Sequence, residues 1–230
     1  MVRVAVVRFP GSNCDWDAYH AVANAGAEAR FVWHRDTDLQ QADVVILPGG
    51  FSYGDYLRSG AIARFSPVMQ AVQKHAAAGG AVLGICNGFQ ILREAHLLPG
   101  ALGRNDRLTF VSRPVWVRVE RTDTFCTSAY ARGTAMRIPV AHGDGCYVAD
   151  DDTLRLLEAE GRVVLRYIRG ENPNGSVADI AGVSNAAGNV VGFMPHPERY
   201  ADPLTGSDVG AGFFRSIAGW IPGGAARSTT

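Results

Sequence analysis

The feature that most constrains the fold is a series of short, continuously apolar runs that alternate with helical segments in the first half of the chain. Residues 44–47 read Val-Val-Ile-Leu, and residues 81–85 read Ala-Val-Leu-Gly-Ile. Because neither run alternates with polar residues, both predict strands that are buried on both faces. We therefore expect an α/β fold, with an open, mostly parallel, twisted sheet and helices on both of its faces.

Turn and capping residues indicate where the other elements begin and end. Ser66-Pro67 places a capping residue and a proline at a helix start, and Gly26 and Gly79 are typical helix stops. The first half is expected to contain strands at residues 2–7, 31–33, 44–47 and 81–85, and helices from Ser12 or Asn13 to about 25, over 66–78 and over 86–96.

From about residue 108 onward the chain is rich in strand-forming residues. Residues 185–189 read Asn-Ala-Ala-Gly-Asn, which predicts a hairpin turn between two strands. Because no linker or repeat interrupts the pattern, we expect one domain over residues 1–222 and a flexible tail over 223–230. The expected elements are strands at 108–120, 136–142, 163–168, 179–184 and 190–194 and a last helix at 208–220.

Charge and hydropathy exclude several classes of function. The 230 residues contain 22 Lys and Arg and 22 Asp and Glu, so the chain has no net charge to attract nucleic acid or an anionic membrane. No apolar run approaches the ~18 residues that span a bilayer. We expect a cytoplasmic protein that binds neither nucleic acid nor membrane, and the low charged fraction of 19% hints at a surface covered by a partner.

The four cysteines are too far apart to form a Cys-x-x-Cys metal or redox pair. We expect them to be reduced and no metal to be bound. Cys126 and Cys146 are interpreted as small buried hydrophobes. Cys14 is interpreted as a packed thiol at a helix start, although it follows the first strand closely enough to contact a site.

Residues 84–88, Gly-Ile-Cys-Asn-Gly, have the composition of a nucleophile turn between a strand and a helix. Such a turn needs small residues two positions before and after the nucleophile, which here would be Cys86. The helix that begins just after Cys86 would favour the reactive thiolate. The alternative is a core cysteine between two glycines that merely allow close packing.

Residues 195–198, Pro-His-Pro-Glu, follow a predicted strand and place His196 and Glu198 on the same side of an extended segment. A carboxylate that orients an imidazole is the arrangement that activates a nucleophile. His-x-Glu also occurs in zinc deaminases, but their downstream Pro-Cys-x-x-Cys is absent from this sequence. The alternative is a hydrogen-bonded surface histidine beside an exposed glutamate.

Residues 48–51, Pro-Gly-Gly-Phe, form a turn with little side chain at the end of a buried strand. Its N–H groups, together with that of Asn87, could stabilise an oxyanion. The alternative is an ordinary loop. All three segments fall at strand ends, where open α/β sheets bind their ligands.

These segments also resemble those of a known family. Residues 48–50, 84–90 and 195–198 are similar to the three signature blocks of the class I, or triad-type, glutamine amidotransferases. The resemblance narrows to the glutaminase subunits of phosphoribosylformylglycinamidine synthase, the separate-chain form of bacteria and archaea. It extends from about residue 2 to 220 and includes residues 8–15, 49–58, 171–176 and 194–199.

The resemblance implies that the chain hydrolyses glutamine to glutamate and ammonia through a glutamyl-thioester. Cys86 would be the nucleophile, His196 would relay the proton and Glu198 would orient His196. The N–H groups of Gly50 and Asn87 would stabilise the oxyanion. A large synthetase subunit would use the ammonia and ATP to convert formylglycinamide ribonucleotide into formylglycinamidine ribonucleotide in purine biosynthesis.

The resemblance also implies that Gln90, His142 and Gly143 bind the substrate glutamine. The chain departs from the family where relatives read His-Gly-Glu-Gly, because Asp144 replaces the glutamate. No cofactor is expected in this chain, since it has no phosphate-binding loop, and ATP and Mg would bind to the synthetase partner. A small third subunit could bridge the complex.

Two other functions stay open at this point. One is a stand-alone cysteine hydrolase of similar fold, such as a γ-glutamyl hydrolase, and the other is a catalytically silent docking or regulatory subunit. Residues 52–58 are too polar and aromatic for a plain connector. We expect them to face a partner or to cover the ammonia exit, and a deletion that leaves coupling to the synthetase intact would contradict this.

Overall fold

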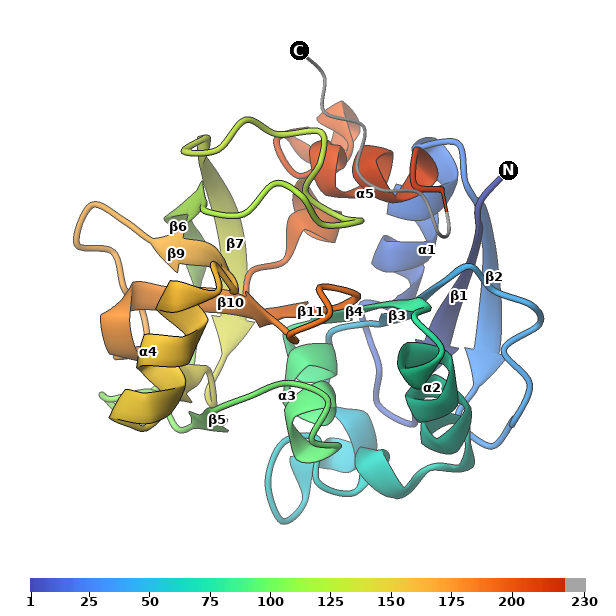
Figure 1. Ribbon diagram of the computed structural model, residues 1–230, viewed down its shortest axis with the longest axis horizontal. Helices are drawn as coiled ribbons and strands as arrows, with labels where there is room; N and C mark the ends of the chain where they lie inside the picture. Colours follow the sequence, from blue (N-terminus) through green and yellow to red (C-terminus); the bar gives the residue numbers. More distant parts are fainter. Residues whose placement is uncertain (222–230) are drawn as a thin grey trace.

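A computed structural model describes residues 1–221 and contains a nine-stranded sheet and a small two-stranded sheet (Figure 1). The large sheet has the order β2-β1-β3-β4-β11-β10-β9-β6-β7. Its strands are β1 (Arg3–Arg8), β2 (Glu28–Trp33), β3 (Val44–Leu47), β4 (Ala81–Ile85), β6 (Val111–Val119), β7 (Ala135–His142), β9 (Val163–Tyr167), β10 (Ile180–Ser184) and β11 (Val190–Phe193), and the small sheet pairs β5 (Ala101–Gly103) with β8 (Cys146–Val148).

The large sheet has a parallel half and an antiparallel half. Strands β2, β1, β3, β4 and β11 are parallel, whereas the pairs from β11 to β7 are antiparallel. Every residue of β3 and β4 is buried, as their continuous apolar runs predict. The α/β fold class is therefore confirmed, and the carboxyl ends of β3, β4 and β11 meet at one edge.

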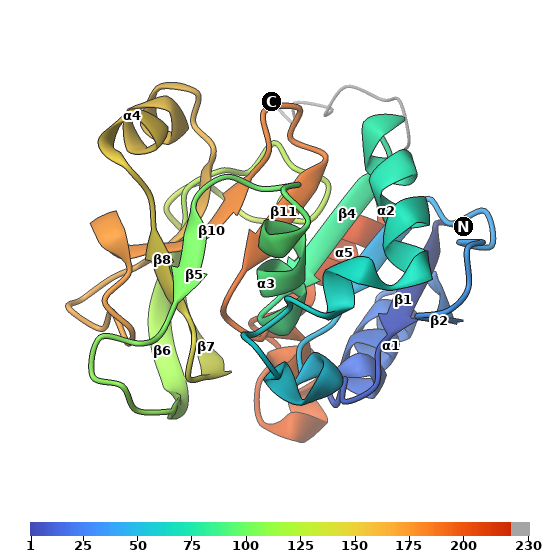
Figure 2. The same ribbon diagram turned by 90° about the horizontal axis from the view of Figure 1, so that it is seen from below.

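Helices cover both faces of the parallel half. Helices α1 (Asp15–Asn24) and α5 (Ala211–Ala218) pack together on one face, while α2 (Pro67–Ala77) and α3 (Asn87–Glu94) lie on the other (Figures 1 and 2). Helix α4 (Asp151–Ala159) lies beside the antiparallel half. Within the described residues, no helix combines the length and the apolar composition that crossing a membrane requires.

Several expected boundaries are wrong. Helix α1 begins at Asp15 after Cys14, because the preceding loop turns back to hold Ser12 against Phe9. The last helix begins at Ala211 rather than at residue 208. The sequence interpretation missed β5, β8 and α4, although Asp150 caps α4 by accepting a hydrogen bond from the Thr153 N–H at 2.7 Å. The expected tail over 223–230 lies outside the described residues.

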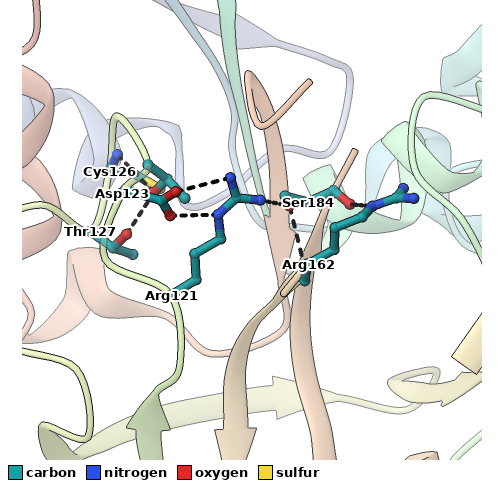
Figure 3. Close-up of polar contacts among 7 residues, drawn as sticks. Arg121, Asp123, Cys126, Thr127, Arg162 and Ser184 are labelled. Carbon is teal, nitrogen blue, oxygen red and sulfur yellow. Dashed lines mark hydrogen bonds and ion pairs between the residues drawn. The ribbon is translucent and has the colours of Figure 1, made fainter. Parts of the chain in front are cut away.

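The antiparallel half is joined by a polar cluster at the end of the sheet opposite the catalytic cysteine candidate (Figure 3). Arg121 Nη1 donates to Ser184 Oγ at 3.0 Å, and Arg162 Nε donates to the Ser184 carbonyl at 3.2 Å. These residues follow β6, precede β9 and end β10, so the cluster ties three strands together. Beside it, burial raises the pKa of Cys126 to about 12, as suits an inert core thiol.

Candidate active site

Cys86 stands at a strained junction between β4 and α3. Its backbone has φ 49° and ψ −106°, a conformation that residues with a side chain rarely adopt. A Cβ at Gly88 would lie 1.9 Å from the Leu47 carbonyl oxygen, and one at Gly84 would lie 2.7 Å from the Gly88 backbone. Only glycine lets α3 begin this close to the sheet, so the junction has the geometry of a nucleophile turn.

His196 and Glu198 form a buried pair after β11. His196 Nδ1 is 2.6 Å from Glu198 Oε1, and the two side chains are 1% and 0% exposed. Among residues 1–221, His196 Nε2 has no hydrogen-bond partner. Burial alone would lower the pKa of His196, but Glu198 and Cys86 outweigh it and raise that pKa well above its ordinary value. The geometry therefore suits an imidazole that exchanges a proton beside Cys86.

Two glycines after β3 leave room for this imidazole and for the loop that precedes α1. A Cβ at Gly49 would lie 2.6 Å from His196 Cε1, and Gly50 has φ 139° with Asn13 N only 2.7 Å from where its Cβ would be. Asn87 is the first residue of α3, so its N–H is free of intrahelical bonding. The two predicted oxyanion donors therefore follow neighbouring parallel strands, β3 and β4, and lie at the same edge of the sheet.

A cavity of about 160 Å³ opens beside Cys86. Five of the eight predicted site residues line it: Gly50, Cys86, Gln90, His142 and Gly143. The other three, Asn87, His196 and Glu198, are outside its lining. The complete lining is Gly50, Phe51, Asp55, Ser59, Cys86, Gln90, Phe110, Ala141, His142, Gly143 and Asp144.

Two carboxylates line this cavity, and the sequence analysis gave neither of them a role. Asn87 Nδ2 donates to Gln90 Oε1 at 2.9 Å and to Asp55 Oδ1 at 3.3 Å. Gln90 Nε2 in turn donates to the Asp144 carbonyl at 2.5 Å. The Asp144 side chain accepts from Ser59 Oγ at 3.0 Å. Burial raises the pKa of Asp55, and the charge of Asp144 adds to this.

Segment 52–58 divides between the cavity and the solvent. Asp55 lies in the cavity lining, whereas Tyr56 and Leu57 are 74% and 89% exposed. Arg58 pairs with Glu94 on α3 at 2.6 Å. The expectation that this segment faces a partner or covers an exit stays a prediction.

Cys14 lies closer to the catalytic candidates than its interpretation as a packed thiol implied. Its sulfur is fully buried and accepts a hydrogen bond from Arg199 Nη2 at 3.0 Å. One ligand atom each of Cys14, His196 and Glu198 lie within 4.8 Å of one another, as a metal site would require. The guanidinium of Arg199 opposes a second cation there, so we ascribe this cluster to hydrogen bonding. Cys14 and Arg199 belong to segments 8–15 and 194–199 of the family resemblance, and this was the sequence signal that could have placed Cys14 at the site.

Comparison with known proteins identifies the class. The CobB/CobQ-like glutamine amidotransferase domain matches residues 1–220 of the chain. The chain therefore belongs to this family of glutamine amidotransferases, as the sequence resemblance predicted.

More similar relatives narrow the assignment. A Rubrobacter xylanophilus protein named phosphoribosylformylglycinamidine synthase subunit PurQ is 63% identical over 216 residues, covering 94% of this chain and 97% of that protein. A Streptomyces avermitilis protein of the same name is 57% identical over 224 residues, covering 94% and 96%. A structure of PurLQS from Thermotoga maritima has a chain that is 47% identical, with TM-score 0.86 and coverage of 94% and 97%.

Proposed function

We propose that this chain is the glutaminase subunit of a phosphoribosylformylglycinamidine synthase. The observation that carries the proposal is the placement of a strained Cys86 beside the buried His196–Glu198 pair. In addition, the chain matches relatives that have that subunit's name, and the matches cover nearly their whole length. The lining of the cavity beside Cys86 includes the polar side chains of Asp55, Gln90 and Asp144, which can bind the polar groups of glutamine.

The proposed reaction begins with transfer of the Cys86 proton to His196 Nε2. Glu198 stabilises the resulting imidazolium through Nδ1, because its carboxylate accepts that N–H at 2.6 Å. The thiolate attacks the side-chain amide carbon of glutamine and forms a C–S bond. The negative charge moves to the amide oxygen, where the N–H groups of Gly50 and Asn87 stabilise it.

The tetrahedral intermediate then collapses with loss of ammonia. The leaving nitrogen takes the proton from His196, the C–N bond breaks, and a glutamyl-thioester remains on Cys86. Water attacks the thioester while His196 accepts its proton, and glutamate leaves as the thiol reforms. Gln90 and the backbone at His142 and Gly143 hold the substrate in this scheme.

The ammonia is used by a large synthetase subunit with ATP and Mg, and a small subunit bridges the two. PurLQS of Thermotoga maritima, by its name, is the kind of assembly that this proposal implies. We further propose that residues 1–222 form one domain, that this chain carries no cofactor or metal, and that it acts in the cytoplasm, where purine nucleotides are made.

The two alternative functions are a stand-alone cysteine hydrolase and a catalytically silent docking or regulatory subunit. A stand-alone hydrolase would turn over fully without a synthetase, and a silent subunit would not need Cys86. The retention of the strained Cys86 conformation argues against a silent subunit, since the strain stabilises nothing in the fold.

The experiment is to measure glutamate release from glutamine by the wild-type chain and by Cys86→Ala. Each is assayed with and without the ATP-dependent synthetase and its substrates. Release that depends on Cys86 and rises when the synthetase is added supports the proposal. Full activity of the isolated chain favours the stand-alone hydrolase, and synthesis that survives Cys86→Ala favours the silent subunit.

A further inference from the structure

One wall of the cavity is formed by residues 141–144, Gly145 follows directly after it, and each of the five carbonyl groups of residues 141–145 has a partner. Two of these carbonyls, at Ala141 and Asp144, meet Cys86 Sγ at 3.7 Å and Gln90 Nε2 at 2.5 Å within the cavity. The other three are held by asparagines outside the cavity lining: His142 O by Asn105 Nδ2 at 2.9 Å, Gly143 O by Asn105 N at 2.8 Å and Gly145 O by Asn174 Nδ2 at 2.8 Å.

The amide of Asn105 can take only one orientation. It is 1% exposed, and its Nδ2 donates to the carbonyls of His142 and Thr109 at 2.9 and 2.8 Å. Its Oδ1 accepts from the Gly145 N–H at 3.0 Å. The same oxygen lies 3.0 Å from His142 Nδ1. Because an amide oxygen only accepts, Nδ1 of His142 must carry a proton.

The amide of Asn174 is fixed in the same way on the other side of the ring. It is fully buried, and its Oδ1 accepts from the N–H and the hydroxyl of Ser176 at 3.1 and 2.7 Å. Its Nδ2 therefore faces His142 Nε2, at 3.4 Å. An amide NH₂ only donates, so this contact disfavours a proton on Nε2, while the nearer acceptors of its two hydrogens are the Gly145 carbonyl at 2.8 Å and the Tyr167 hydroxyl at 3.3 Å. The two asparagines together select the neutral Nδ1–H tautomer of His142.

The electrostatic surroundings of His142 agree with this assignment. Burial, assisted by the charge of nearby His196, lowers the pKa of His142 to about 4. The other titratable group at the cluster is the hydroxyl of Tyr167, which lies 3.3 Å from Asn174 Nδ2, and burial raises its pKa. Neither neighbour supplies a negative charge that would favour an imidazolium.

We propose that Asn105 and Asn174 are positioning residues for glutamine binding. They hold His142 in one neutral tautomer and so fix the backbone of residues 141–145, of which residues 141–144 form the substrate wall. This inference rests on the proposed function, because it takes glutamine as the substrate. It also gives a role to segment 171–176, which the sequence analysis associated with the family without assigning it a function.

The test is the isosteric variant Asn174→Asp, assayed as glutaminase with the synthetase present. The carboxylate keeps an acceptor for Ser176 but loses the donor to Gly145 O, and it attracts a proton to His142 Nε2. We expect KM for glutamine to rise about tenfold, as for one lost buried hydrogen bond to a binding wall. Because the nucleophile and its base are untouched, kcat should change less than about threefold.

Nitrogen NMR of the histidine side chains supplies a readout that a merely structural role would not move. In the wild type, His142 should keep its Nδ1–H tautomer down to a pH near 4, and in Asn174→Asp it should titrate at a higher pH. Asn105→Asp is the second variant, expected to raise KM because it loses the donor to His142 O.

The matched control is Asn189→Ala, which removes an amide that donates to the carbonyls of Ala76 and Gly80 at 2.8 Å each, at the far end of β11. It should lower stability and leave KM unchanged. A wild-type KM in Asn174→Asp with a protonated His142 would overturn the inference, as would a fall in kcat at constant KM. A wild type that releases no glutamate under any condition would instead overturn the proposed function, and the NMR result would still decide the tautomer.

Discussion

After β3 and β11, at the carboxyl edge of the sheet, buried polar atoms of Ser52, His196 and Glu198 have no hydrogen-bond partner among residues 1–221. At the opposite end of the sheet, Arg162 and Ser184 are buried and Arg121 is half-buried, and none of their buried nitrogen or oxygen atoms is left unpartnered in that part of the chain. An unpaired buried polar atom costs about 1–3 kcal/mol. Three of the six such atoms among residues 1–221 belong to Ser52, His196 and Glu198, and the other three belong to Arg8, Asp15 and Arg93. The catalytic end of the sheet is therefore less stable than full hydrogen bonding would make it, whereas Arg121, Arg162 and Ser184 at the other end are fully paired.

The largest expected effect comes from Cys86→Gly, which removes the nucleophile and the strained side chain together. Glutamine hydrolysis should fall by roughly three orders of magnitude or more. The free energy of unfolding should rise by about 1 kcal/mol, because glycine tolerates φ 49°. Glutamate release and denaturant unfolding measure the two effects. Cys86→Ala is the control, equally inactive but still strained, and equal stability of the two variants would show that the junction stores no strain.

Glu198→Gln should reduce kcat by about 10²- to 10⁴-fold, because the imidazolium loses the carboxylate that stabilises it. The variant also tests the pKa of His196, which Glu198 raises against the opposing effect of burial. A raised pKa in the folded state adds stability that is complete below the unfolded value of about 6.5 and is lost as pH rises through the folded value.

The wild type should therefore exceed Glu198→Gln in stability most at about pH 5–6, with the difference shrinking as pH rises above about 6.5. Urea unfolding at several pH values measures this. A stability difference that grows with pH would contradict the raised pKa of His196.

Arg162→Ala tests the end of the sheet opposite Cys86, where we expect a substitution to affect stability rather than activity. Its side chain is 9% exposed and donates to the Ser184 carbonyl, so the free energy of unfolding should fall by about 2 kcal/mol while kcat/KM for glutamine stays within about twofold. Arg155→Ala is the matched control, since Arg155 is 74% exposed and pairs with Asp152 at the surface, a contact that contributes less than about 0.5 kcal/mol. A large loss of activity in Arg162→Ala would show that the two ends are coupled.

The smallest effect is expected from Cys14→Ala, which removes the acceptor of the Arg199 N–H beside His196. The loss of one hydrogen bond near the reacting groups should lower kcat about fivefold. Cys14→Ser keeps an acceptor and should retain more activity than Cys14→Ala. Steady-state glutaminase assays measure both, and indistinguishable variants would return Cys14 to the role of a packed thiol.

Much of this protein follows from its sequence alone. The buried runs at β3 and β4 determine the parallel core, because only a strand covered on both faces is apolar at every position. The spacing of Gly84, Cys86 and Gly88 predicts the nucleophile turn, since that turn needs small residues at fixed offsets. The three segments 48–50, 84–90 and 195–198 together also predicted the family, which the match over residues 1–220 confirms.

Other features depend on contacts between residues far apart in the chain, and these only the tertiary structure decided. Asn105 and Asn174 lie on separate loops and meet only around His142, so no local pattern announces their hydrogen bonds. Cys14 reaches His196 because β1, β3, β4 and β11 follow one another in the sheet, which brings the segments after β1 and β11 to the same edge. Local sequence determines which backbone conformations are available, whereas partners across the fold decide which buried polar atoms are satisfied and which remain free for chemistry.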